Sequence, residues 1–106
     1  MPVAITKENV DHEIGLSTLP VVLDVYATWC GPCQQMAPIF EELEQELGSK
    51  YKFAKLNVDE AREISIKYGV TSVPTFIFIK GNVVQGKETG YMGKEALEAK
   101  IKELLG

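Results

Sequence analysis

The chain has 106 residues, 45% of them hydrophobic and 25% charged, with a formal net charge of −4 at pH 7. A chain of this length buries roughly 65% of the surface that its unfolded form exposes, so it can fold as one domain without a disulfide or a metal. Its acidic balance argues against nucleic acid and anionic membranes as partners. From its length we expect a single domain over residues 1–106. Because no secretory signal opens the sequence and no apolar run has the length of a membrane span, we expect it to act in the cytoplasm.

Residues 3–5 are predicted to form a short edge strand, and a helix with Thr6 as its N-cap is predicted to follow. The apolar positions of this helix are Val10, Ile14 and Leu16. His12 falls on its polar side, where a single histidine is interpreted as a solvated surface residue.

Residues 21–27 form a near-continuous apolar run, which is typical of a central strand buried on both faces. Asp24 interrupts this run. A helix is predicted over residues 31–48, with glutamates on its exposed face and a glycine at its end. Its apolar stripe consists of Ile39, Phe40, Leu43 and Leu47.

The second half of the chain continues the alternation of strands and helices. Residues 51–58 are predicted as a second core strand, and Asp59 as the cap of a short helix that ends at Gly69. The apolar residues of this helix are Ala61, Ile64 and Tyr68. Residues 75–79 are the run with the strongest β propensity in the protein.

A hairpin and a last helix complete the chain. Gly81-Asn82 is a two-residue hairpin signal, and residues 83–85 are predicted to begin the return strand. Residues 86–93 contain three glycines and are expected to be a loop by their end. The last helix is predicted over residues 94–105, with its buried positions at Leu97, Ile101, Leu104 and Leu105.

The predicted order of elements is β-α-β-α-β-α-β-β-α. Helices that cross over between the early strands imply parallel pairing, whereas the late hairpin adds an antiparallel edge. The sequence therefore predicts a three-layer α/β fold, in which a mixed central sheet has helices on both faces.

Both cysteines lie in the segment Trp29-Cys30-Gly31-Pro32-Cys33, between the predicted central strand and the helix after it. Two residues three apart in a helical turn reach disulfide geometry after a modest adjustment. Cys30 is predicted at the helix N-cap, where free N–H groups and the helix dipole stabilise a thiolate, so it is the candidate nucleophile. Cys33, shielded in the first turn, is the candidate resolving thiol. Gly31 lets a partner chain approach closely, and Pro32 stiffens the turn.

Asp24 requires an explanation, because a carboxylate inside an apolar strand is costly unless it is partnered, and burial raises its pKa. One interpretation is a structural aspartate bonded to the backbone or to water. The interpretation that we favour is a proton acceptor for Cys33, acting through a water while Cys33 attacks a mixed disulfide. Lys55, also in an apolar strand, is either a charge neighbour of Asp24 or a surface lysine.

Two other classes of function compete with redox chemistry. Zinc needs about four nitrogen or sulfur ligands, and beyond the two cysteines the chain offers only His12 and carboxylates, unless two chains share a metal. A protein-interaction module would bind partners in the same region without turnover. The intact cysteine pair and Asp24 argue against binding as the sole function.

Taken together, these residues resemble the thioredoxin family over essentially the whole chain. A lone Cys-x-x-Cys is a weak signal, but the full set is very specific. The resemblance implies a thioredoxin fold, a redox-active disulfide between the two cysteines, and a protein-disulfide reductase that takes part in electron transport and cell redox homeostasis. The shared motifs, in the family's order and spacing, are Asp24, Trp29-Cys30-Gly31-Pro32-Cys33, Ala37-Pro38, residues 54–59, Lys67-Tyr68-Gly69-Val70, Val73-Pro74-Thr75 and Gly90.

The resemblance also implies how the site works. Cys30 attacks, Asp24 assists Cys33, and a cis Val73-Pro74 bond faces the cysteines, although sequence statistics alone predict a trans bond. No cofactor is bound: electrons are expected from an NADPH-dependent thioredoxin reductase, the substrates are disulfide-containing proteins, and a monomer is expected. The groove for extended substrate is implied to consist of Trp29, Gly31, Pro32, Val73, Pro74 and the Thr89-Gly90-Tyr91 turn.

Three positions depart from the family's common pattern. Tyr26 stands where many members have a tryptophan, Gln34 replaces the usual basic residue after the second cysteine, and Gly81-Asn82 reverses the usual order of the hairpin pair. The charge lost at Gln34 is expected to alter the pKa of the nucleophile and docking to the reductase. None of the three departures removes a catalytic group.

Overall fold

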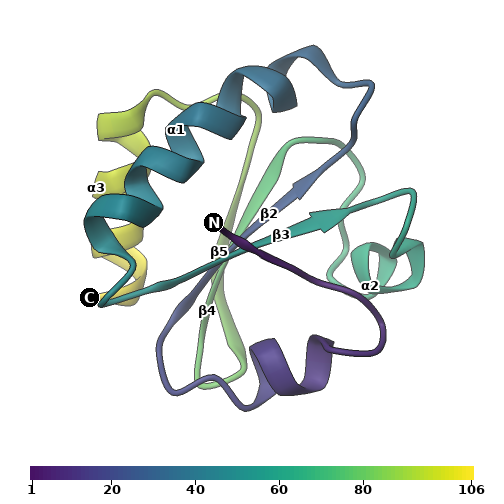
Figure 1. Cartoon of the computed structure of the whole chain (residues 1–106), viewed down its shortest axis with the longest axis horizontal. Helices are drawn as coiled ribbons and strands as arrows, with labels where there is room; N and C mark the ends of the chain where they lie inside the picture. The colour runs from purple at the N-terminus through teal and green to yellow at the C-terminus, as the bar shows by residue number, and fades with distance from the viewer.

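The structure is a computed structural model that describes all of residues 1–106. Strands and helices alternate in the predicted order, as Figure 1 shows. None of the helices combines the length and the apolar character needed to cross a bilayer. The elements are β1 (Val3–Ala4), the π-helix η1 (Asp11–Gly15), β2 (Val21–Tyr26), α1 (Gly31–Leu47), β3 (Lys52–Asn57), α2 (Arg62–Lys67), β4 (Thr75–Lys80), β5 (Val83–Thr89) and α3 (Lys94–Leu105).

The five strands form one mixed sheet in the order β1-β3-β2-β4-β5. β3 pairs in parallel with β1 and β2, whereas β4 is antiparallel to both β2 and β5. The prediction of parallel early strands and an antiparallel late hairpin is therefore confirmed. Gly81 and Asn82 both have positive φ, as the two-residue turn that matches the twist of a hairpin requires, so the reversed pair still makes this turn.

Helices cover both faces of the sheet, so that the sheet divides the core into two halves (Figure 1). α1 and α3 lie over one face, where the core is aromatic and includes Phe40, Phe53 and Phe76. η1 and α2 lie over the other face, where aliphatic side chains such as Ile14 and Ile64 dominate. β2 contributes side chains to both halves, which explains why its sequence is apolar almost throughout.

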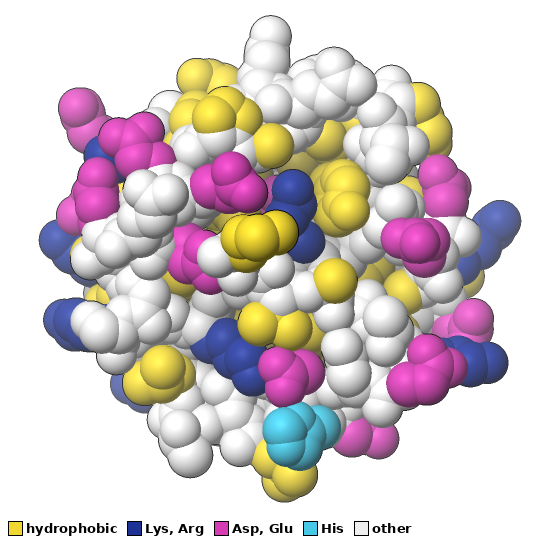
Figure 2. All heavy atoms as spheres, in the orientation of Figure 1, with side chains coloured by type: hydrophobic (Ala, Val, Ile, Leu, Met, Phe, Trp, Pro, Cys, Tyr) yellow, Lys and Arg dark blue, Asp and Glu magenta, His cyan; other side chains and the backbone are white.

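The first helix is shorter than predicted. Thr6 and Asn9 close a turn before it: the Asn9 N–H donates to the Thr6 hydroxyl at 3.2 Å, and the Thr6 N–H donates to the Asn9 side-chain oxygen at 2.8 Å. Only the five-residue η1 follows, and Leu16, predicted in the apolar stripe, is 73% exposed. His12 is exposed, as predicted, and it is the only histidine in the surface view of Figure 2.

Element ends elsewhere are mostly as predicted, with one error. Asp59 does not cap α2; the N-cap residue is Ala61, without a side-chain hydrogen bond, because the chain makes one more turn after β3 before the helix begins. β5 runs to Thr89 before the expected loop. Gly86 in this strand makes room for Leu104 of α3, since a Cβ at residue 86 would lie 2.9 Å from a Leu104 methyl carbon. Leu104, predicted to be buried, is only partly buried.

Two isoleucines on α2 provide a matched test of the aliphatic half of the core. Ile64 is 8% exposed and packs against the sheet, whereas Ile66 is 63% exposed. We expect Ile64→Ala to lower the free energy of unfolding by roughly 2–5 kcal/mol, because it leaves a cavity, and Ile66→Ala to change it by less than about 0.5 kcal/mol. Urea denaturation measures both values, and equal losses would contradict this orientation of α2.

Candidate active site

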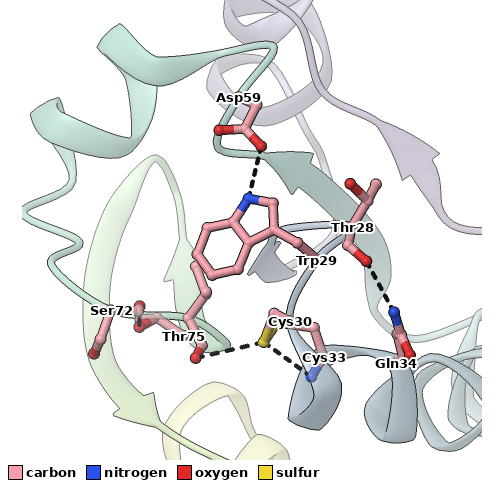
Figure 3. The surroundings of a disulfide bond; sticks show 9 residues. Thr28, Trp29, Cys30, Cys33, Gln34, Asp59, Ser72 and Thr75 are labelled. Carbon is pink, nitrogen blue, oxygen red and sulfur yellow. Dashed lines mark hydrogen bonds between the residues drawn. A yellow bond between two sulfur atoms is a disulfide. The ribbon is translucent and has the colours of Figure 1, made fainter.

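The two cysteines meet at the junction between β2 and α1. They form a disulfide whose Cα atoms are 5.2 Å apart, within the usual range. Cys30 is the N-cap of α1, and its Sγ accepts a hydrogen bond from the Cys33 N–H at 3.2 Å (Figure 3). The helix therefore begins at this pair, as the sequence predicts. Pro32 lies in the first turn, where its missing N–H leaves no helical bond unmade.

The two sulfurs differ in position more than in exposure. Cys30 is 6% exposed and Cys33 is 4% exposed, so both are shielded while they are joined. Cys30 Sγ lies 3.7 Å from the Val73 carbonyl oxygen, whereas Cys33 lies on the buried side of α1 together with Met36 and Phe40. The loop at Val73 therefore borders Cys30, and Cys33 faces the core.

The Val73-Pro74 peptide bond is cis, as the resemblance implies and contrary to sequence statistics. Two hydrogen bonds hold this loop in place. The Gly90 N–H donates to the Pro74 carbonyl at 2.8 Å, and the Thr75 hydroxyl donates to the Ser72 carbonyl at 2.7 Å. The turn that follows β5 is therefore tied to the loop beside the cysteines.

Trp29 forms one wall of a surface pocket next to the cysteines. Its side chain is 70% exposed, and its indole N–H donates to the Asp59 carboxylate at 3.0 Å (Figure 3). This contact uses the carboxylate that the sequence assigned to the cap of α2. The pocket has a volume of about 520 Å³ and is lined by Trp29, Val58, Asp59, Arg62, Ser65, Ile66, Val70, Thr71, Ser72 and Val73.

Only part of the implied substrate groove coincides with this pocket. Trp29 and Val73 line it, while Gly31 and Pro32 are exposed at the start of α1 and Tyr91 is 55% exposed beyond β5. Sequence reasoning missed the wall that consists of α2 and the segments on either side of it. No local motif marks that wall, because its residues come from separate segments that only the fold brings to Trp29.

Asp24 is fully buried, and neither of its carboxylate oxygens has a hydrogen-bond partner. Its neighbours across the sheet are Lys55 on β3 and Phe76 on β4. Burial raises the pKa of Asp24 to about 7, and the positive charge of Lys55 acts in the opposite direction. Because side chains alternate along β2, Asp24 lies on the same face as Val22, which is the face covered by α1. The carboxyl group therefore lies on the side of the sheet where Cys33 is found.

Tyr26 and Gln34, the two departures from the family pattern that lie near the site, each make a specific contact. The Lys55 ammonium lies over the Tyr26 ring, 4.4 Å from its centroid, while Lys55 is also opposite Asp24 in the strand register. The Gln34 side-chain amide donates to the Thr28 carbonyl at 2.9 Å, which ties the segment before the cysteines to the first turn of α1 (Figure 3).

The chemistry available to the site follows from the cysteine pair. A cysteine pair at a helix N-terminus, next to an exposed pocket, exchanges with other thiols and disulfides through direct attack by a thiolate: the disulfide form accepts attack by a dithiol, and the reduced form attacks a disulfide. No group of three or more His, Cys, Asp or Glu side chains is arranged to hold a metal ion.

Comparisons with known proteins identify one family. A sequence model described as thioredoxin matches residues 1–103. The thioredoxin of Bacillus subtilis is 45% identical over 80% of this chain and 82% of its own length, and that of Alicyclobacillus acidocaldarius is 44% identical over 81% and 82%. The chloroplastic M-type thioredoxin of Pisum sativum is 39% identical over 84% of this chain and 52% of its own length. These matches, together with the Cys30–Cys33 disulfide, show that the chain belongs to the thioredoxin family and is a thiol–disulfide oxidoreductase, a protein-disulfide reductase.

Proposed function

We propose that Cys30 is the attacking thiolate of the reduced protein and that Cys33 is the resolving thiol. The observation that carries this assignment is the hydrogen bond from the Cys33 N–H to Cys30 Sγ at the N-cap of α1. The same N–H and the helix dipole stabilise a Cys30 thiolate relative to its thiol. The buried position of Cys33 supports its second role, because it is presented to Cys30 and not to solvent.

The proposed exchange has two steps. The Cys30 thiolate attacks one sulfur of a substrate disulfide, which forms a mixed disulfide and releases the other substrate sulfur as a thiolate. Cys33 then loses its proton and attacks Cys30 Sγ, which releases the second substrate thiolate and closes the Cys30–Cys33 disulfide. The substrate gains two electrons and the protein loses two.

Asp24 is proposed as the acceptor of the Cys33 proton, through a water. A pKa of about 7 supports this role, because a general base works best when its pKa lies near the ambient pH. The lack of a partner for either carboxylate oxygen argues against a structural aspartate bonded to the backbone. Lys55 is proposed as the charged neighbour that limits the rise in the pKa of Asp24.

The surface around Cys30 is proposed to bind an extended segment of the substrate protein. The exposed Trp29 and the pocket beside it provide apolar area, and the 3.7 Å separation between Cys30 Sγ and the Val73 carbonyl supports a substrate path along the Val73 loop. The proposed contact residues are Trp29, Gly31, Pro32, Val73, Pro74, Thr89, Gly90 and Tyr91.

The wider setting is proposed from the family. We infer a single domain, supported by one continuous sheet and by a family match over residues 1–103. The monomeric state and the cytoplasmic location are inferred from the family alone. The inferred electron donor is an NADPH-dependent thioredoxin reductase, and the inferred substrates are disulfide-containing proteins. The protein would then serve electron transport and cell redox homeostasis. No observation favours an interaction module without turnover.

Substitution of each cysteine separates the two proposed roles. Cys30→Ser is expected to abolish the reduction of insulin by NADPH and thioredoxin reductase, because the attacking sulfur is missing. Cys33→Ser should instead accumulate a mixed disulfide with substrate, detected by mass spectrometry, because the second attack is missing. Normal turnover by Cys33→Ser would contradict the assignment, and faster turnover of the unaltered protein with glutathione would contradict the proposed donor.

The raised pKa of Asp24 makes a prediction about stability. The unfolded chain loses this proton near pH 3.8 and the folded chain near pH 7, so the folded state binds the extra proton between these values and stability falls as the pH rises through this window. We expect Asp24→Asn to remove this fall. The free energy of unfolding of the variant, relative to that of the unaltered protein, should therefore rise by about 4 kcal/mol between pH 4 and pH 8. Urea denaturation at several pH values measures the difference. Asp11→Asn, the same change at an exposed position, serves as the control.

The proposed catalytic role of Asp24 is tested by the rate of the second step. Asp24→Asn is expected to slow the resolution of a preformed mixed disulfide by a factor on the order of 10², and to abolish the increase in rate as the pH passes through about 7, because the proton acceptor is lost. Stopped-flow measurement of substrate release over this pH range provides both results. An unchanged rate and pH profile would show that Asp24 has no part in this step.

A further inference from the structure

Tyr26 and Lys55 make a contact that the proposed mechanism does not use. The Lys55 ammonium lies 4.4 Å from the centroid of the Tyr26 ring, a distance typical of a cation–π interaction. Both side chains are half-buried, so the contact is shielded in part from water. Lys55 takes part in none of the six ion pairs between side chains. Its ammonium lies over the ring of Tyr26 instead.

The strand register places this contact beside the buried carboxyl group. Asp24 and Tyr26 are two residues apart on β2 and therefore lie on the same face of the sheet. Lys55 is paired with Asp24 across the strands, whereas Tyr26 is paired with Asn57, so the lysine and the tyrosine are diagonal neighbours. Tyr26 also packs against the cluster that contains Cys30 and Cys33. Tyr26 therefore contacts both the charged neighbour of Asp24 and the cluster to which the redox-active pair belongs.

Few charged groups face Asp24 from the elements packed around it. β3 contributes Lys55, β4 contributes the apolar Phe76, and the buried side of α1 contributes the Cys33 sulfur but no charge. Glu88 of β5 pairs with Phe76 and thus lies one strand further away. Lys55 is accordingly the one charge that acts on the ionisation of Asp24.

We propose that Tyr26 is a positioning residue, whose ring holds the Lys55 ammonium beside Asp24 so that the lysine's charge acts on this carboxyl group. A lysine on a half-exposed strand otherwise extends its flexible chain toward water, where solvent screens its charge. The ring provides an alternative site for the ammonium close to the sheet. The proposal rests on the proposed role of Asp24 and adds to it a means by which position 26, one of the departures from the family pattern, adjusts the proton acceptor.

A packing role for Tyr26 makes a different prediction from a positioning role. Leucine would fill much of the same space but has no aromatic face to attract a cation, whereas phenylalanine keeps the face and loses only the hydroxyl. If the ring acts through Lys55, Tyr26→Phe leaves the ionisation of Asp24 unchanged and Tyr26→Leu raises its pKa. If the ring acts only by packing, Tyr26→Leu changes the pKa of Asp24 by the same amount whether or not Lys55 is present.

The experiment is a double-mutant cycle that follows Asp24 directly. The ¹³Cγ chemical shift of Asp24 is titrated by NMR in the oxidised full chain, in the unaltered protein and in Tyr26→Phe, Tyr26→Leu, Lys55→Gln and Tyr26→Leu/Lys55→Gln. We expect Tyr26→Leu to lower the acid dissociation constant of Asp24 roughly two- to five-fold, the order of an exposed cation–π contact, and Lys55→Gln to lower it by at least as much. Tyr26→Leu should add no further change in the Lys55→Gln background, and Tyr26→Phe should match the unaltered protein.

The outcomes distinguish this inference from the proposed function. A titration midpoint that is unmoved in Tyr26→Leu, or that moves equally with and without Lys55, overturns the inference. If Tyr26→Leu does not fold, an unmoved midpoint in Lys55→Gln overturns it equally, and an altered midpoint in Tyr26→Phe counts against it. The role of Asp24 is judged separately by the rate of mixed-disulfide resolution in Asp24→Asn, which does not involve Tyr26 at all.

Discussion

The burial of β2 on both of its faces is the constraint on which the rest of the structure depends. The strand lies between β3 and β4, and each of its faces is covered by helices. Because β2 has no solvated face, the Asp24 carboxyl group is fully buried, and this burial raises its pKa. The same strand ends where α1 begins, so its position also determines where the disulfide lies. One buried strand thus determines the positions of both the carboxyl group and the cysteine pair.

Stability and activity make opposite demands at this strand. A hydrophobic side chain at residue 24 would suit the aromatic half of the core, and an unpartnered carboxylate there lowers stability above the pKa of the unfolded chain. The helix N-terminus has no such conflict, because the bond from the Cys33 N–H to Cys30 Sγ caps α1 and at the same time favours a thiolate. The cost is therefore confined to the one residue proposed to accept a proton.

Local patterns predicted the elements well and some of their contacts poorly. The alternation of apolar runs, the hairpin pair and the glycine after α2 all act over a few residues, and the structure contains each of them where it was expected. The first helix was overestimated, since only the five-residue η1 follows the turn that Thr6 and Asn9 close, and Leu16 is exposed. Asp59 was assigned to a cap because a cap is the nearest use of an aspartate before a helix, whereas its partner, Trp29, is 30 positions away.

The sequence by itself determined the fold class, the placement of Cys30 at a helix N-terminus, and the anomaly of a carboxylate in a buried strand, because periodicity, capping and spacing are local properties of the chain. The cis bond before Pro74 was expected from the family resemblance and not from local statistics. Only the tertiary structure decided the pocket beside Trp29, the position of Lys55 over Tyr26 and the approach of Val73 to Cys30. These features join residues far apart in the chain, as Cys30 and Val73 are, 43 positions apart. Strand pairing and helix packing bring such residues together, and no local propensity records which side chains then meet.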